Sequence, residues 1–110
     1  MDANYKYATH MISWIEKMQV PKTSLAKESF TKVKSYWLEN AEVNLEELRN
    51  KLWAWVDSNN GYDTKRSKVA KMRMILCLAY EDNRELEDIG YFEDLLVSLG
   101  ISYEEAYKRT

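Results

Sequence analysis

Cysteine, histidine, proline and glycine are scarce in this chain of 110 residues, which holds one Cys, one His, one Pro and three Gly. The single cysteine, Cys77, cannot form an internal disulfide, and this favours a reducing compartment. One cysteine and one histidine, His10, are also too few for a zinc site. Few breakers and 13% aromatic residues argue against a disordered chain. The length is that of one domain.

The motifs of common active sites are missing as well. There is no glycine-rich phosphate loop, and Cys77 lies in the apolar run 74–79, where cysteine acts as a small buried hydrophobe. The segment 57–63 resembles the start of a calcium loop, but Lys68 stands where such a loop carries its bidentate glutamate. We therefore expect no catalytic residue, no metal and no cofactor.

Long apolar runs are absent too. The first residues do not have the form of a secretory signal peptide, and no apolar run approaches the roughly 18 residues that span a bilayer. The sequence therefore predicts a cytoplasmic protein that does not contact a membrane.

Apolar residues recur at intervals of three and four along most of the chain, which is the pattern of amphipathic helices. No segment shows sustained alternation of apolar and polar residues. We expect helices over about 4–19, 24–40, 45–58, 64–79, 88–99 and 103–108. The fourth is apolar nearly all round, so it should be the most buried. The prediction is an all-α fold: a single irregular bundle of five to six helices that forms one domain over residues 1–110.

Start and stop signals support these boundaries. Thr23 or Ser24 can cap the second helix, and Asp63 or Thr64 the fourth. Asn44 precedes Glu47 by three residues and Ser102 precedes Glu105 by three, which is the spacing of a capping box. Gly100 stands where a helix commonly ends in a left-handed residue.

Charge is distributed unevenly behind a net value of -2. Positions 63–73 hold five basic residues and one acidic residue, whereas positions 81–105 hold nine acidic residues and one basic residue, Arg84. The basic segment fits contact with nucleic acid phosphates, but a pI of about 5.5 favours pairing with acidic helices of the same chain. The acidic segment fits a cationic surface of another protein or a solvated face.

The chain is rich in aromatic residues, with four Trp and eight Tyr. Trp53 and Trp55 point about 200° apart on a helix, so they cannot both face one core. Exposed Tyr and Trp beside carboxylates are typical of protein-binding surfaces. The alternative is that these rings cover the edges of the core with their polar ends in water.

Lys68–Asp82 (KVAKMRMILCLAYED) and Tyr91–Leu96 (YFEDLL) resemble small helical immunity proteins of bacterial toxin systems, including contact-dependent inhibition and polymorphic toxins. The resemblance is confined to the stretch 68–96. It implies a cytoplasmic, non-enzymatic protein that binds a cognate toxin domain and blocks its active site. Many such toxins are basic nucleases, which an acidic face would suit.

We therefore predict a partner-binding face within the acidic segment, with two tyrosines as aromatic anchors. Its expected members are Tyr80, Glu81, Asp82, Glu85, Glu87, Asp88, Tyr91, Glu93 and Asp94. The expected partner is a basic protein toxin, and the chain is expected to be a monomer or dimer. Two alternatives remain. One is a nucleic-acid-associated regulatory protein that uses Lys65, Arg66, Lys68, Lys71 and Arg73. The other is a homo-oligomeric adaptor subunit with exposed tryptophans at its interface.

Overall fold

The computed structural model describes residues 3–60, 67–82, 85 and 92–108. These ranges contain six α-helices and no strand, which confirms the predicted all-α bundle. The helices are α1 (Ala3–Met18), α2 (Ser24–Glu39), α3 (Leu45–Ser58), α4 (Ser67–Leu78), α5 (Phe92–Ser98) and α6 (Tyr103–Ala106).

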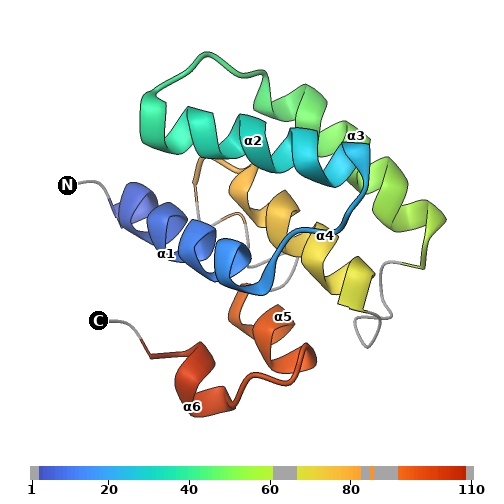
Figure 1. Cartoon of the computed structure of the whole chain (residues 1–110). Coiled ribbons are helices and arrows are strands. Elements are labelled where there is room, and N and C mark those ends of the chain that lie inside the picture. The colour runs from blue at the N-terminus through green and yellow to red at the C-terminus, as the bar shows by residue number, and fades with distance from the viewer. Residues whose placement is uncertain (1–2, 61–66, 83–84, 86–91, 109–110) are drawn as a thin grey trace.

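Helix α4 lies at the centre of the bundle (Figure 1). It packs against α1, α2, α3 and α5, and α6 packs against α5. Eight of its 12 residues are buried, so the prediction that this helix is the most buried one is confirmed. A helix with buried residues on several sides is stable in water only when other helices cover those sides. The other helices supply that cover.

The surrounding helices each bury one face. Five residues of α1 are buried: Tyr7, Ala8, Met11, Ile12 and Ile15. Four of α3 are buried: Leu45, Leu48, Leu52 and Val56. Full burial of a Leu, Ile, Met or Val side chain stabilises the fold by about 1.5–3 kcal/mol relative to exposure. The three-and-four spacing of these residues therefore determines which face of each helix meets α4.

The helix starts that fall in the described ranges follow the predicted signals. The side-chain oxygen of Thr23 accepts a hydrogen bond from the Ala26 N–H at 3.3 Å, so Thr23 rather than Ser24 caps α2. Asn44 Oδ1 accepts from the Glu47 N–H at 3.1 Å at the start of α3. The predicted caps of α4, at 63 and 64, and the predicted start of α5, at 88, lie outside the described residues.

The turn between α5 and α6 also follows the predicted signals. Ser102 Oγ accepts a hydrogen bond from the Glu105 N–H at 3.2 Å and caps α6. Gly100 has a φ of +97°, a backbone conformation that residues with a Cβ rarely adopt. This residue turns the chain from α5 toward α6.

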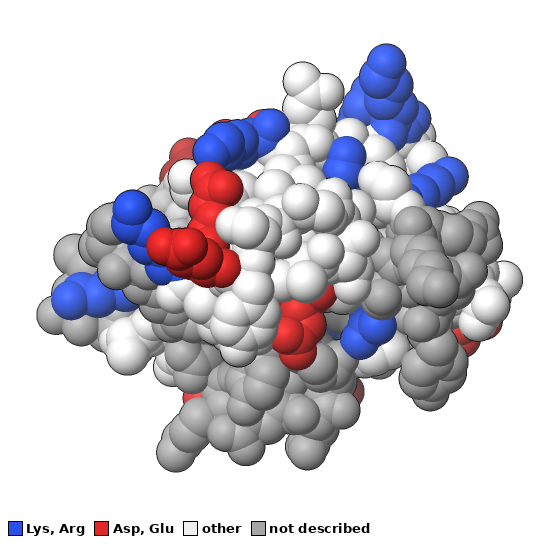
Figure 2. Space-filling view, turned by 90° about the horizontal axis from the view of Figure 1, so that it is seen from below, with Lys and Arg blue, Asp and Glu red and all other residues white. Residues whose placement is uncertain are grey.

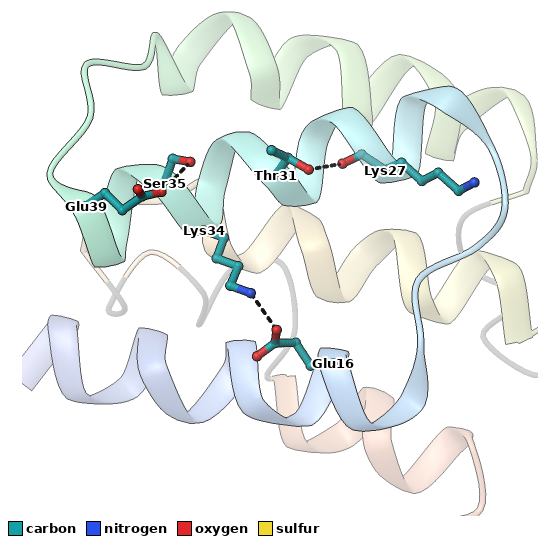
Figure 3. Close-up of polar contacts among 6 residues, drawn as sticks. All are labelled: Glu16, Lys27, Thr31, Lys34, Ser35 and Glu39. Atoms are coloured by element: carbon teal, nitrogen blue, oxygen red, sulfur yellow. Dashed lines mark hydrogen bonds and ion pairs between the residues drawn. The ribbon is translucent and has the colours of Figure 1, made fainter.

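Three side-chain contacts of α1 and α2 lie at the surface and are exposed (Figure 3). The Lys34 ammonium group lies 2.6 Å from the Glu16 carboxylate and links α2 to α1. Thr31 donates a hydrogen bond to the Lys27 carbonyl, and Ser35 donates one to Glu39. Exposed ion pairs contribute about 0–1 kcal/mol, so the bundle depends mainly on its apolar core.

Within the described ranges, no helix combines the length and the apolar character needed to cross a bilayer.

The substitution Ser29→Ala should stabilise the protein by about 1 kcal/mol. Ser29 is 1% exposed, and no described residue provides a hydrogen-bond partner for its Oγ. A buried hydroxyl without a partner has lost its hydrogen bonds to water and gained none in return. Urea unfolding of wild type and variant measures the change, with the exposed Ser58→Ala as the control. A less stable Ser29→Ala protein would contradict this account.

Candidate partner-binding surface

The C-terminal end of α4 is closed by side chains from two other helices. Trp37 of α2 donates its indole N–H to the Leu78 carbonyl at 2.8 Å, and Arg49 of α3 donates to the Ala79 carbonyl at 2.9 Å. Carbonyl groups at a helix C-terminus have no partner within the helix, and a cation there is favoured by the helix dipole. These two bonds therefore hold the end of α4 against α2 and α3.

Tyr80, the first predicted anchor, belongs to the same assembly. Its hydroxyl accepts a hydrogen bond from the Trp53 indole N–H at 2.9 Å, and the Arg49 guanidinium lies 5.0 Å from the centre of its ring. The side chain is half-buried and packs against the core. Tyr80 therefore helps to join α4 to α3, and only part of its ring is open to a partner.

Three predicted acidic residues follow Tyr80. Glu81 and Glu85 are exposed, and Asp82 is half-buried. Partial burial raises the pKa of the Tyr36 hydroxyl above its ordinary value, and the negative charge of Glu81 raises it further. Tyr36 also borders a shallow hollow of about 720 Å³ that is lined by residues 40–44. An exposed carboxylate thus stands beside a half-buried tyrosine at this end of the bundle.

Glu93 does not lie on an exposed face, although it was predicted to be part of one. It is 1% exposed, and its Oε2 accepts a hydrogen bond from the Tyr7 hydroxyl of α1 at 2.7 Å. On α5, Glu93 lies one helical turn before the buried Leu96, so it shares the inward face. The number of acidic residues in the segment does not reveal that one of them, Glu93, meets the buried hydroxyl of Tyr7.

Asp94 is exposed and contacts Tyr107, which stacks on Tyr103, and the sequence analysis placed neither tyrosine in the site. The Tyr107 hydroxyl donates a hydrogen bond to Asp94 Oδ1 at 2.6 Å. The rings of Tyr103 and Tyr107 stack with their centres 4.5 Å apart. Tyr103 is 68% exposed and Tyr107 37% exposed. Their spacing of four residues, with Glu104 and Glu105 between them, was the available signal.

The predicted face is thus divided among three places. Tyr80, Glu81, Asp82 and Glu85 lie at the end of α4, Asp94 lies on the α5–α6 unit, and Glu93 is in the core. The remaining predicted members, Glu87, Asp88 and Tyr91, lie outside the described residues. Figure 2 shows the described acidic side chains of one face in separate groups, with basic side chains near them. A cationic partner would therefore meet small separate acidic groups rather than one continuous acidic face.

Two lysines of the basic segment, Lys68 and Lys71, form no ion pair with a described carboxylate, although the sequence interpretation expected such pairing. The Lys71 ammonium donates to the Met18 carbonyl at 2.9 Å, at the C-terminus of α1. The Lys68 ammonium lies 5.7 Å from the centre of the Trp55 ring. Both contacts connect helices without neutralising a negative charge. Lys65 and Arg66 lie outside the described residues.

Cys77 is a core residue, as its apolar neighbours predict. It is 2% exposed, and burial raises the pKa of its thiol to about 12. The charge of Arg73 lowers this pKa somewhat and that of Glu93 raises it. The thiol is therefore protonated at neutral pH and is not a ready nucleophile. Among the described residues, no group of His, Cys, Asp and Glu side chains is arranged to hold a metal ion.

No protein-family model, curated protein or solved structure matches this chain. The resemblance to immunity proteins therefore stays a prediction.

The substitution Tyr7→Phe should destabilise the protein by about 1.5–3 kcal/mol, because it removes a donor from the buried Glu93 carboxylate. Urea unfolding measures the loss, with the half-buried Tyr5→Phe as the control. The same change in a Glu93→Gln background should be less costly, since a neutral amide needs the donor less. Equal losses in both backgrounds would show that the Tyr7–Glu93 bond is not the cause.

The contribution of the Tyr107–Asp94 bond to stability should disappear in alkali. The hydrogen bond to Asp94 raises the pKa of Tyr107 from 10.0 to about 12. Because the folded-state pKa is the higher one, the contribution is complete below pH 10 and is lost as the pH rises toward 12. The stability difference between wild type and Tyr107→Phe should therefore shrink over that interval. Urea unfolding at a series of pH values tests this, with Tyr103→Phe as the control, and a pH-independent difference would refute it.

Proposed function

We propose that this chain is a non-enzymatic inhibitor of the immunity type, which binds a basic toxin domain and covers its active site. The observation that carries the proposal is the exposed, stacked pair Tyr103–Tyr107 beside three exposed carboxylates. We call Asp94, Tyr103, Glu104, Glu105 and Tyr107 the tyrosine–carboxylate surface. In the described range 92–108, Lys108 is the only basic residue.

The chemistry of this surface suits a cationic protein partner. Tyrosine rings contribute a large contact area at a low cost in conformational entropy. The face of an exposed ring attracts the ammonium or guanidinium group of Lys or Arg, and carboxylates form charge-assisted hydrogen bonds with the same groups. A basic toxin offers both kinds of side chain.

The surface is also held in place before any partner arrives. The Tyr107–Asp94 hydrogen bond connects the end of α6 to α5, and stacking orients Tyr103 on Tyr107. Side chains that are already ordered lose less entropy on binding, which increases affinity. The order of these side chains before binding is therefore stronger support for a binding site than the charge of the surface alone.

The acidic residues at the end of α4 have a different role in this proposal. Glu81, Asp82 and Glu85 follow a tyrosine that already has structural contacts, so we assign them to electrostatic attraction of the partner. Charges of this kind mainly accelerate association and make it sensitive to salt.

The oligomeric alternative has no comparable support. It requires exposed tryptophans, but all four tryptophans are half-buried and pack against the core: Trp14, Trp37, Trp53 and Trp55. They match the other sequence interpretation, in which aromatic rings cover the core edges.

The test compares three versions of the full chain as baits in native-host lysate at physiological salt. One is wild type, one carries Tyr103→Ala, Glu104→Lys and Glu105→Lys, and the control carries Glu28→Lys and Glu46→Lys on α2 and α3. Both variants change the charge equally at exposed acidic sites. Wild type and control should each retain one basic protein in stoichiometric amount, identified by mass spectrometry. The surface variant should lose it, because its tyrosine and carboxylate contacts are gone.

The captured protein then decides the function. Its expression alone should arrest growth of a bacterial host, and co-expression of wild type or control, but not of the surface variant, should restore growth. Equal capture by all three baits would refute the assignment of the surface. Capture of a protein that is harmless when expressed would refute the inhibitor function itself.

A further inference from the structure

A second charged feature lies on a different part of the bundle and has the opposite sign. A hollow of about 430 Å³ opens between the α1–α2 connection and the start of α4. Its lining consists of Pro21, Lys22, Thr23, Ser67, Lys68 and Lys71. We call it the lysine hollow. Half of its lining residues are lysines, and none is acidic.

The three ammonium groups are not neutralised by the described part of the chain. None of Lys22, Lys68 and Lys71 forms an ion pair with a described carboxylate. Like charges around one hollow repel each other, so the arrangement carries an electrostatic cost unless an anion lies among them. Among the described residues, Lys34 forms an ion pair with Glu16 of α1, but Lys34 does not line this hollow.

Two of the three lysines are held by contacts outside the lining. Lys71 donates one of its three N–H groups to the Met18 carbonyl, so two remain for another acceptor. Lys68 lies over the Trp55 ring. These contacts restrict long side chains that would otherwise move freely, which reduces the entropy lost when they bind a ligand.

Neutral hydrogen-bond donors complete the lining. Thr23 Oγ1 accepts the Ala26 N–H, so its own O–H remains available as a donor, and Ser67 adds a second hydroxyl. The lining residues Thr23 and Ser67 stand at the first turns of α2 and α4, where the helix dipoles add positive potential to that of the lysines. Strong donors from both sides of the hollow suit an anion with several acceptor oxygens.

We propose that the lysine hollow binds a polyphosphate, because three ammonium groups and two hydroxyls around one hollow can meet several phosphate oxygens. The hollow is open to solvent, and its volume of about 430 Å³ leaves room for more than one phosphate group. The ligand is a diphosphate or a nucleoside diphosphate, or the same chemistry presented by a nucleic acid backbone. This inference does not depend on the inhibitor function, because it uses no residue of the tyrosine–carboxylate surface.

The test measures binding of pyrophosphate, ADP and a single-stranded oligonucleotide to the full chain by calorimetry. The hollow variant carries Lys22→Gln and Lys68→Gln, and the control carries Lys27→Gln and Lys32→Gln, two lysines of α2 outside the hollow. All four are exposed, so both variants should fold, which circular dichroism checks. The hollow variant should bind pyrophosphate and ADP at least about tenfold more weakly than wild type, and the control should match wild type.

The position of the ligand is read independently by NMR. Backbone amide signals of Thr23, Ser24 and Lys68 should shift with pyrophosphate, while those of Tyr103 and Tyr107 should not. If the oligonucleotide binds more tightly than ADP and also loses affinity in the hollow variant, the phosphate source is a nucleic acid. The reverse order assigns a free polyphosphate. Absence of binding by all three probes, or equal weakening in both variants, would overturn the proposal.

Discussion

The burial of α4 is the constraint on which the rest of the structure depends. Eight of its 12 residues are buried under four other helices, and the carbonyl groups at its end lose contact with water. Trp37 and Arg49 replace that water. The same two contacts position Tyr80 and the acidic residues that follow it. The position of the acidic residues at the end of α4 therefore follows from the contacts that complete the core.

Most of the fold could be predicted because the relevant signals are local. Apolar spacing and capping residues such as Asn44, Ser102 and Gly100 act within a few positions of the chain, and each has its expected role. The candidate site depends on contacts between distant segments. Glu93 and Asp94 are adjacent in sequence, yet one is buried against α1 and the other is exposed beside α6. Charge counting treats them alike, since only the packing of α5 separates them.

The two proposed binding regions differ in how they offset charge. At the tyrosine–carboxylate surface, a tyrosine hydroxyl supports Asp94, and neighbouring rings provide contact area. At the lysine hollow, the cations are held by a backbone carbonyl and an aromatic face, neither of which cancels their charge. One chain can therefore present an acidic and a basic site while its net charge stays at -2. Their independence allows each to be altered without disturbing the other.

The Tyr7–Glu93 bond joins positions that are 86 residues apart, and this separation has a consequence for assembly of the fold. Contacts of long sequence separation require closure of a large loop and tend to form late. During synthesis, α1 leaves the ribosome long before α5 exists. Its inward face can begin to pack on α2 and α4, but its buried hydroxyl gains its carboxylate only when α5 docks. The first helix thus completes its contacts after most of the bundle is built, and in a chain truncated before α5 the Tyr7 hydroxyl would lose Glu93 as its acceptor.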